Sequence, residues 1–265
     1  MILYLVRHGK PDYTTDTLLP EGWEQARRVS NRLAASGLDA IYSSPMGRAR
    51  ETAQPTAERL GLPIQVEEWA HELGHESDAL FPDGSYRTIS ELPHEHFHKE
   101  PLVSLTQPQA LACAPGLTDT HFAERVKELG DGLDGLLARN GYARQPNGLY
   151  LATEHTDRHI ALFCHAGMTR VLVSHLMHIP VHLLMTASVP HFTAVTAFLF
   201  HREEHGPETT PILMSFGDCG HLYDDQPLTA CWHHVPFGER SIAWPISTRC
   251  ASSCSPTITG RCWAT

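Results

Sequence analysis

The feature that most constrains the fold is an alternation of short apolar runs with helical periods over residues 2–66. The runs at 2–6, 40–43 and 64–66 are short and rich in apolar residues, as in strands buried on both faces of a parallel sheet. Between them, residues 21–35 and 47–60 place small and apolar side chains at helical spacing. The order strand, helix, strand, helix, strand predicts an α/β fold with right-handed crossovers.

The pattern loosens after residue 66 and returns near residue 118. Residues 74–117 are rich in Pro, His and Glu without a clear period, and so long an irregular segment is uncommon inside a compact domain. We therefore expect an inserted cap of short helices there, and a helix at 118–139 opened by Thr118 or Asp119. Further strands and helices are expected at residues 149–153, 159–164, 167–178, 192–200 and 211–216.

These elements predict a three-layer α/β/α sandwich with a mostly parallel sheet over residues 1–240, interrupted by the cap at 74–117. Residues 241–265 carry Ser, Cys and Pro without a period, which predicts an irregular C-terminal tail. The alternate histidines at 94–98 resemble a metal-binding tract, but a biased run is only compositional evidence. We interpret them as a polar part of the cap.

Charge and composition exclude several classes of protein. The net charge is −10, which argues against a nucleic-acid surface and requires any anion site to be built locally. No apolar stretch approaches the ~20 residues that span a bilayer, and no basic leader precedes the first apolar run. The seven cysteines do not form a disulfide framework. We expect a soluble cytoplasmic protein without nucleic-acid or membrane partners, and a homodimer stays open.

Basic side chains gather where the predicted strands end. Arg7 and His8 follow the first strand and precede Gly9, which would let the backbone pass closely beside a bound group. His165 follows the strand at 159–164. In open α/β sheets ligands bind at the carboxyl ends of the strands. These residues are therefore expected to meet at one site.

Helix N-termini strengthen this expectation. The helix expected at 167–178 starts just after His165 and Ala166, and its free N–H groups favour an anion. Arg48 lies in the first turn of another predicted helix, where a positive charge opposes the helix dipole. A bound phosphate between the helix and Arg48 would remove that conflict, because arginine binds phosphate bidentately. A neutral histidine could then attack phosphorus.

These motifs resemble the histidine phosphatase superfamily, also called phosphoglycerate mutase-like. The resemblance covers residues 1–66 well and 158–216 loosely, and it leaves out the cap and the tail. It rests on motifs in a fixed order, namely Arg7-His8-Gly9, Leu19-Pro20-Glu21-Gly22-x-x-Gln25-Ala26, Ser43-Ser44-Pro45-x-x-Arg48-Ala49-x-x-Thr52-Ala53 and His165-Ala166-Gly167.

The resemblance implies a role for each matching residue. His8 corresponds to the nucleophile that becomes phosphohistidine, and Arg7, Arg48 and His165, with Ala166 beside them, form the phosphate-binding set. Glu72, after the third strand, corresponds to the acid that protonates the leaving oxygen. The implied reaction is hydrolysis of a small phosphorylated metabolite without metal or cofactor. One departure is Tyr13-Thr14, where family mutases carry an asparagine.

Three alternatives stay open. A phosphoglycerate-mutase-type phosphotransferase would use the same residues, and a binding module on an inactive enzyme scaffold would hydrolyse nothing. The third is a zinc hydrolase, because His71-Glu72-x-x-His75 matches H-E-x-x-H. That motif needs a helix that holds both histidines on one face, and Gly74 weakens a helix there by about 1 kcal/mol relative to Ala.

Overall fold

The computed structural model describes residues 1–74, 78–81, 84–89, 120–154, 156–201 and 207–223. All of them belong to the first of two units into which the chain divides, Met1–Cys231. The histidines at 94–98 and the expected tail at 241–265 lie outside the described residues, as does most of the expected cap. The predicted domain limits at residues 240 and 241 therefore stay predictions.

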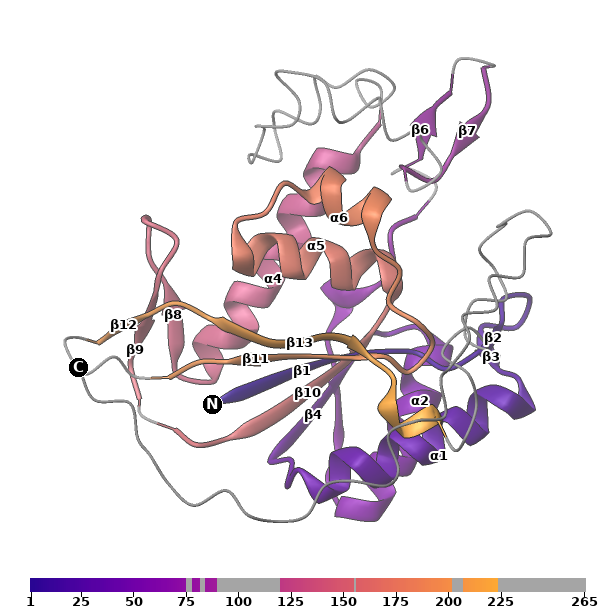
Figure 1. Ribbon diagram of the computed structural model, residues 1–265, viewed down its shortest axis with the longest axis horizontal. Helices are drawn as coiled ribbons and strands as arrows, with labels where there is room; N and C mark the ends of the chain where they lie inside the picture. The colour runs from indigo at the N-terminus through magenta and orange to yellow at the C-terminus, as the bar shows by residue number, and fades with distance from the viewer. Residues whose placement is uncertain (75–77, 82–83, 90–119, 155, 202–206, 224–265) are drawn as a thin grey trace, which may run out of the picture. The chain divides into compact units, whose positions relative to one another are not determined.

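A six-stranded, largely parallel sheet forms the centre of the first unit (Figure 1). Its order is β13-β11-β1-β10-β4-β5, in which β1, β10, β4 and β5 are parallel and β11 runs antiparallel to both β1 and β13. The bounds are β1 Ile2–Arg7, β4 Ala40–Ser43, β5 Ile64–Val66, β10 His159–Cys164, β11 Val195–Leu199 and β13 Ile212–Asp218. The central strands are buried on both faces, which explains their continuous apolar sequences.

Helices cover both faces of the sheet, as Figure 1 shows. On one face lie α1 (Pro20–Ala35) and α2 (Gly47–Leu60), and on the other lie α4 (Phe122–Arg139), α5 (Ala166–Met177) and α6 (Val181–Ala187). Each helix layer closes an apolar core against the sheet, the larger one under α4 and α5. The predicted three-layer α/β/α architecture is confirmed.

The helical periods predicted most of the helix bounds. The sequence indicated a buried stripe at positions 49, 52, 53, 56, 57 and 60 of this helix. In α2 the first five of these are buried together with Arg48, whereas Leu60 is only partly buried. The expected start of α4 at Thr118 or Asp119 is wrong. That helix begins at Phe122 after His121, and the Phe122 N–H donates to the Thr120 hydroxyl.

Short elements without a period were not predicted. They include the hairpin β2–β3, which follows His8, and the strands β8 and β12. These two strands flank β9 in a three-stranded sheet, and β9 itself is the strand expected at residues 149–153. Within the expected cap, β6 and β7 form a strand pair, whereas the sequence predicted short helices. The bounds are β2 Pro11–Asp12, β3 Thr17–Leu18, β6 Ala79–Leu80, β7 Tyr86–Arg87, β8 Tyr142–Arg144, β9 Tyr150–Ala152 and β12 Glu208–Thr209, with 3-10 turns η1 Glu68–Ala70 and η6 Gly220–Leu222.

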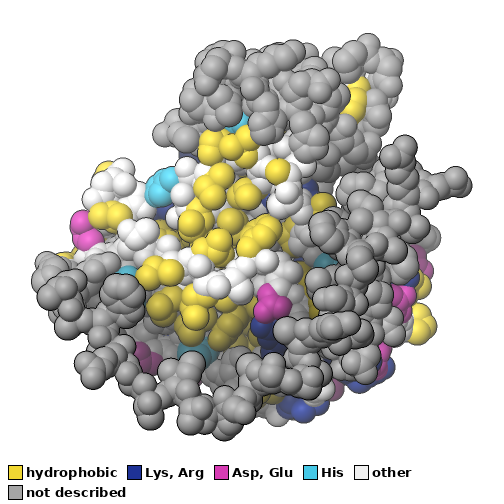
Figure 2. Space-filling model, viewed as in Figure 1, with side chains coloured by type: hydrophobic (Ala, Val, Ile, Leu, Met, Phe, Trp, Pro, Cys, Tyr) yellow, Lys and Arg dark blue, Asp and Glu magenta, His cyan; other side chains and the backbone are white. Residues whose placement is uncertain are grey.

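The edge strand β13 leaves a row of apolar side chains exposed. The side chains of Ile212, Met214 and Phe216, at every second position of this strand, are 45%, 57% and 36% exposed. The face of the molecule seen in Figure 2 carries many apolar side chains. Across the described parts of the chain, no helix has the length and apolarity that crossing a membrane would require.

Two glycines let the end of β1 run against α1. A Cβ on Gly22 would lie 2.2 Å from the backbone oxygen of Lys10, and a Cβ on Gly9 would lie 2.7 Å from that of Gly22. The expected role of Gly9, close passage of a bound group, stays a prediction. In this structure Gly9 makes room for the neighbouring helix.

This close approach predicts opposite effects of two helix substitutions. Gly22→Ala should lower the free energy of unfolding, because the backbone at Lys10 must move. The matched control Gly135→Ala lies in α4, where the nearest atom is 3.8 Å away. It should stabilise the protein by about 0.5–1 kcal/mol, the usual preference for Ala over Gly in helices. Urea unfolding checks both, and equal shifts would contradict the packing argument.

Candidate active site

The register of β1 and β10 brings the two predicted histidines together. The backbone N–H of His8 donates to the carbonyl oxygen of Cys164 at 2.9 Å, which places His8 beside His165. The two imidazole ring centroids are 5.2 Å apart. Both side chains are almost completely buried.

The hydrogen bonding of His8 fixes its tautomer. Nδ1 lies 2.7 Å from the carbonyl oxygen of Gly9. A carbonyl oxygen only accepts hydrogen bonds, so Nδ1 carries the proton and Nε2 keeps a free lone pair. Burial, and then the positive charges of Arg7 and Arg48, lower the pKa of His8 well below its ordinary value. At neutral pH His8 is therefore uncharged and nucleophilic at Nε2.

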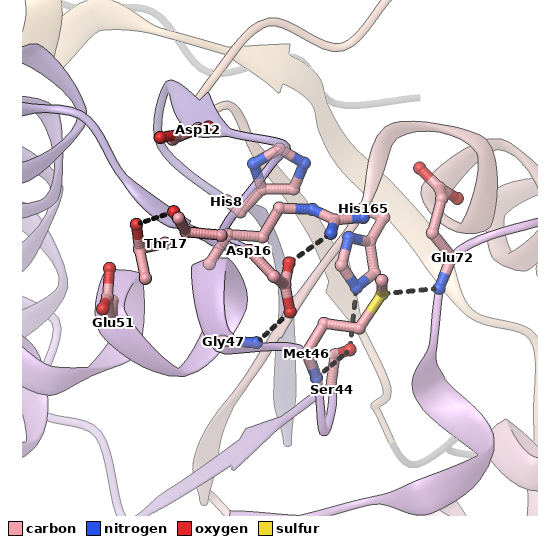
Figure 3. A network of polar contacts seen from close by, with 12 residues as sticks. His8, Asp12, Asp16, Thr17, Ser44, Met46, Gly47, Glu51, Glu72 and His165 are labelled. Carbon is pink, nitrogen blue, oxygen red and sulfur yellow. Dashed lines mark hydrogen bonds and ion pairs between the residues drawn. The ribbon is translucent and has the colours of Figure 1, made fainter.

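His165 is held by a serine that the sequence analysis did not assign a role. Nε2 of His165 lies 2.7 Å from the hydroxyl of Ser44, and that hydroxyl also accepts a hydrogen bond from the Met46 N–H (Figure 3). Nδ1 of His165 is buried without a partner among the described residues. Burial, with His8 and Arg48 nearby, keeps the pKa of His165 well below its ordinary value.

The two predicted arginines lie beside these histidines. The Arg7 guanidinium stacks 4.2 Å above the Phe192 ring and donates to the Pro190 carbonyl oxygen at 2.6 Å. Phe192 also contacts His8, with ring centroids 5.8 Å apart. Arg7 and Arg48 each keep a buried Nε–H that no described residue accepts. Buried donors of this kind mark a place where an anion can bind.

Arg48 has a partner that the sequence did not reveal. Asp16 forms an ion pair with the Arg48 guanidinium and accepts a hydrogen bond from the Gly47 N–H. From the sequence, a bound phosphate was expected to explain the positive charge in the first turn of α2. The structure shows that Asp16 already explains it. The centroid of the Tyr13 ring lies 5.5 Å from Cζ of Arg48. Tyr13 belongs to the Tyr13-Thr14 pair, which stands where the resemblance to family mutases implied an asparagine.

Glu72 lies at the N-terminus of α5. Its carboxylate accepts hydrogen bonds from the N–H groups of Gly167 and Met168 at 3.2 and 2.9 Å. A Cβ on Gly167 would lie 2.9 Å from that carboxylate, so a glycine allows the close approach. The N-terminus of α5 thus binds an acidic side chain of the protein itself, where the sequence had indicated a bound anion. Ala166, the first residue of α5, directly follows His165, which occupies the N-cap position of that helix.

The zinc hypothesis required a helix that the chain does not form. His71 has extended backbone angles, with φ −72° and ψ 161°, and residues 71–74 are not helical. His75 lies outside the described residues. Within those residues, no group of three or more His, Cys, Asp or Glu side chains is arranged to hold a metal ion. The helical H-E-x-x-H geometry is therefore contradicted at its first four positions.

Comparison with known proteins decides the family. The model of the histidine phosphatase superfamily, branch 1, matches residues 3–209. The chain belongs to the histidine phosphatase superfamily. That match extends well beyond the motifs near the two histidines and takes in the helices and strands that carry them.

Sequence relatives within the superfamily match over shorter segments. A putative phosphoserine phosphatase 2 of Hydrogenobacter thermophilus is 35% identical over 80 residues, which is 27% of this chain and 39% of the relative. A probable phosphoglycerate mutase GpmB of Serratia proteamaculans is 34% identical over 71 residues, 23% of this chain and 33% of the relative. The matched segments thus span well under half of these relatives.

Solved structures of phosphatases share the fold. Phosphoserine phosphatase of Entamoeba histolytica, as a mutant in complex with phosphoserine, aligns with a TM-score of 0.56 and 23% identity over 84% of this chain and 99% of that one. A mycobacterial glucosyl-3-phosphoglycerate phosphatase in complex with VO3 aligns with a TM-score of 0.53 and 20% identity over 81% and 98%. At these identities the likeness establishes the fold.

The buried histidines predict how the protein responds to acid. Both have a pKa well below the ordinary value of about 6.5. The unfolded chain therefore binds more protons than the folded chain below about pH 6.5, and the free energy of unfolding should fall as the pH falls there. NMR titration of the imidazole resonances, assigned with His8→Gln, should give midpoints below 6.5. A midpoint above 6.5 for His8 would contradict this account.

Proposed function

We propose that the protein hydrolyses a small phosphomonoester in two steps through a phosphohistidine on His8. The observation that carries this proposal is the free Nε2 lone pair of a neutral, buried His8 beside Arg7, Arg48 and His165. In the first step Nε2 attacks phosphorus and the bond from phosphorus to the ester oxygen breaks. Glu72 starts this step protonated and gives its proton to the departing alkoxide, which leaves a carboxylate for the second step.

The second step returns the enzyme to its starting state. Water attacks the phosphorus of the phosphohistidine while Glu72 takes one of its protons, and the nitrogen–phosphorus bond breaks to release phosphate and neutral His8. Throughout both steps Arg7, Arg48 and the first amide of α5 at Ala166 hold the equatorial oxygens. Such preorganised donors supply most of the catalysis in phosphoryl transfer.

His165 joins these phosphate-binding groups through Nδ1, the ring nitrogen that has no partner among the described residues. A phosphate oxygen only accepts hydrogen bonds, so phosphate selects the tautomer of His165 that carries its proton on Nδ1. In that tautomer the Ser44 hydroxyl donates to Nε2, across the 2.7 Å contact. Ser44 thus supports the orientation of His165 without touching substrate.

The relatives guide the choice of substrates. The names of similar proteins include phosphoserine phosphatase, glucosyl-3-phosphoglycerate phosphatase and phosphoglycerate mutase. A first panel therefore contains phosphoserine, phosphoglycerates and their sugar conjugates, together with nitrophenyl phosphate. Isomerisation of a phosphoglycerate would favour the mutase alternative, and inertness toward the whole panel would favour a binding module.

The phosphohistidine is tested directly with labelled substrate. Acid-labile, base-stable label should appear on the wild type after rapid quenching and should be absent from His8→Ala. His71→Ala is the matched control and should still be labelled, because the His71 ring bonds the Glu72 carbonyl oxygen and its effect on His165 is electrostatic. Label on another residue would remove His8 from the role of nucleophile.

The role of Glu72 predicts a dependence on the leaving group. Glu72→Gln cannot supply a proton, so it should slow alkyl phosphates at least ~10-fold more than nitrophenyl phosphate, whose leaving group is already acidic. Glu68→Gln is the control, because Glu68 is exposed in the same segment. Steady-state rates on both substrates check this. An equal loss on both would leave Glu72 without a proton-transfer role.

The remaining expectations stay predictions. Turnover in EDTA and inhibition by vanadate would support metal-independent chemistry on a small phosphorylated metabolite.

Both described cysteines, Cys164 and Cys219, are free thiols. Free thiols suit a cytoplasmic location, which cell fractionation can test. Light scattering after gel filtration would decide whether the protein is a homodimer.

A further inference from the structure

We infer that Asp16 is a positioning residue that holds Arg48 ready for phosphate. The inference rests on the proposed function and goes beyond it, because Asp16 does not touch the reacting atoms. Its carboxylate instead fixes one edge of the guanidinium, so that another edge is left for the substrate.

One carboxylate contacts two neighbouring residues of α2. Oδ1 of Asp16 forms an ion pair with Nη1 of Arg48, and Oδ2 accepts a hydrogen bond of 2.6 Å from the Gly47 N–H (Figure 3). The Arg48 side chain is only 8% exposed, so its movement is already restricted. The two contacts tie the guanidinium to the first turn of its own helix.

The geometry of the guanidinium determines what remains free. Its N–H groups form planar edges that can each bind two oxygens of a carboxylate or phosphate. Asp16 occupies Nη1, whereas Nε–H is buried and has no partner among the described residues. The edge formed by Nε and Nη2 is therefore the one left to bind two phosphate oxygens. Without Asp16, the guanidinium could rotate and lose that alignment.

The hairpin that carries Asp16 is shaped to deliver it. Asp16 has a φ of +54°, a left-handed conformation that Asp and Asn adopt more readily than other non-glycine residues. A Cβ on Gly47 would lie 2.3 Å from the backbone oxygen of Asp16, so the contact also requires glycine there. A second tether joins the same elements, because Glu51 accepts a hydrogen bond of 2.5 Å from the Leu18 N–H.

These two tethers offer a matched pair of variants. Asp16→Asn can keep the left-handed turn and the bond from the Gly47 N–H, but it loses the charge that pairs with Arg48. Glu51→Gln also neutralises a carboxylate between the hairpin and α2, and that carboxylate binds a backbone amide and not Arg48. A merely structural role for Asp16 predicts that both variants behave alike.

The experiment measures kcat/KM on one phosphomonoester and the inhibition constant for vanadate. Asp16→Asn should lower kcat/KM and weaken vanadate at least ~10-fold, whereas Glu51→Gln should stay within about twofold. In an Arg48→Ala background, which itself should cost ~100-fold as for a lost oxyanion donor, Asp16→Asn should cost nothing more. That loss of effect identifies Arg48 as the residue through which Asp16 acts.

Other outcomes would overturn the inference. Equal losses with and without Arg48, or equal losses in Asp16→Asn and Glu51→Gln, would give Asp16 a structural role. Tighter vanadate binding in Asp16→Asn would mean that the carboxylate competes with phosphate. Should Asp16→Asn fail to fold, Asp16→Gly suits the positive φ and removes the same ion pair, with the same losses expected.

Failure of the proposed function would look different. A wild type that neither binds vanadate nor hydrolyses any phosphoester would overturn the proposed function, and the inference with it. A wild type that does both, with Asp16→Asn unchanged, would overturn the inference alone.

Discussion

The parallel register of β1 and β10 is the constraint on which the candidate site depends. The bond from the His8 N–H to the Cys164 carbonyl oxygen sets the two strand ends level, so that His8 and His165 leave the sheet side by side. Side chains alternate between the two faces of a sheet, and a slip of one residue would send them to opposite faces. The buried apolar side chains of both strands hold this register, because a slip would disturb both cores.

Two helix N-termini complete the site by a common arrangement. At α2 the carboxylate of Asp16 binds the first amide and the guanidinium of Arg48, and at α5 the carboxylate of Glu72 binds amides that follow His165. In each case an acid from elsewhere in the chain satisfies backbone donors and draws on the helix dipole. The acidic side chains of Asp16 and Glu72 and the guanidinium of Arg48 therefore lie around the histidines. The positive charge at the site is local, because the chain as a whole has a net charge of −10.

Burial then gives these groups their chemistry. His8 and His165 have lowered pKa values chiefly because they are buried, and the arginines add to the effect. In the proposed function, a neutral imidazole beside two arginines serves as the nucleophile toward a phosphoester. The same burial lowers the free energy of unfolding in acid, because the unfolded histidines bind protons at a higher pH than the folded histidines do. Reactivity and acid sensitivity therefore share one physical cause.

The sequence by itself determined the α/β class, the helices α1 and α2, the central strands and the motifs around His8, Arg48 and His165, because periodicity and strand-end motifs are local properties. Tertiary structure alone decided the rest. The hairpin β2–β3 has two-residue strands without a period, and Asp16 and Ser44 gain their roles through contacts with residues distant in sequence. No local pattern encodes such contacts, because they depend on how the folded chain brings a turn, a strand end and two helix N-termini together.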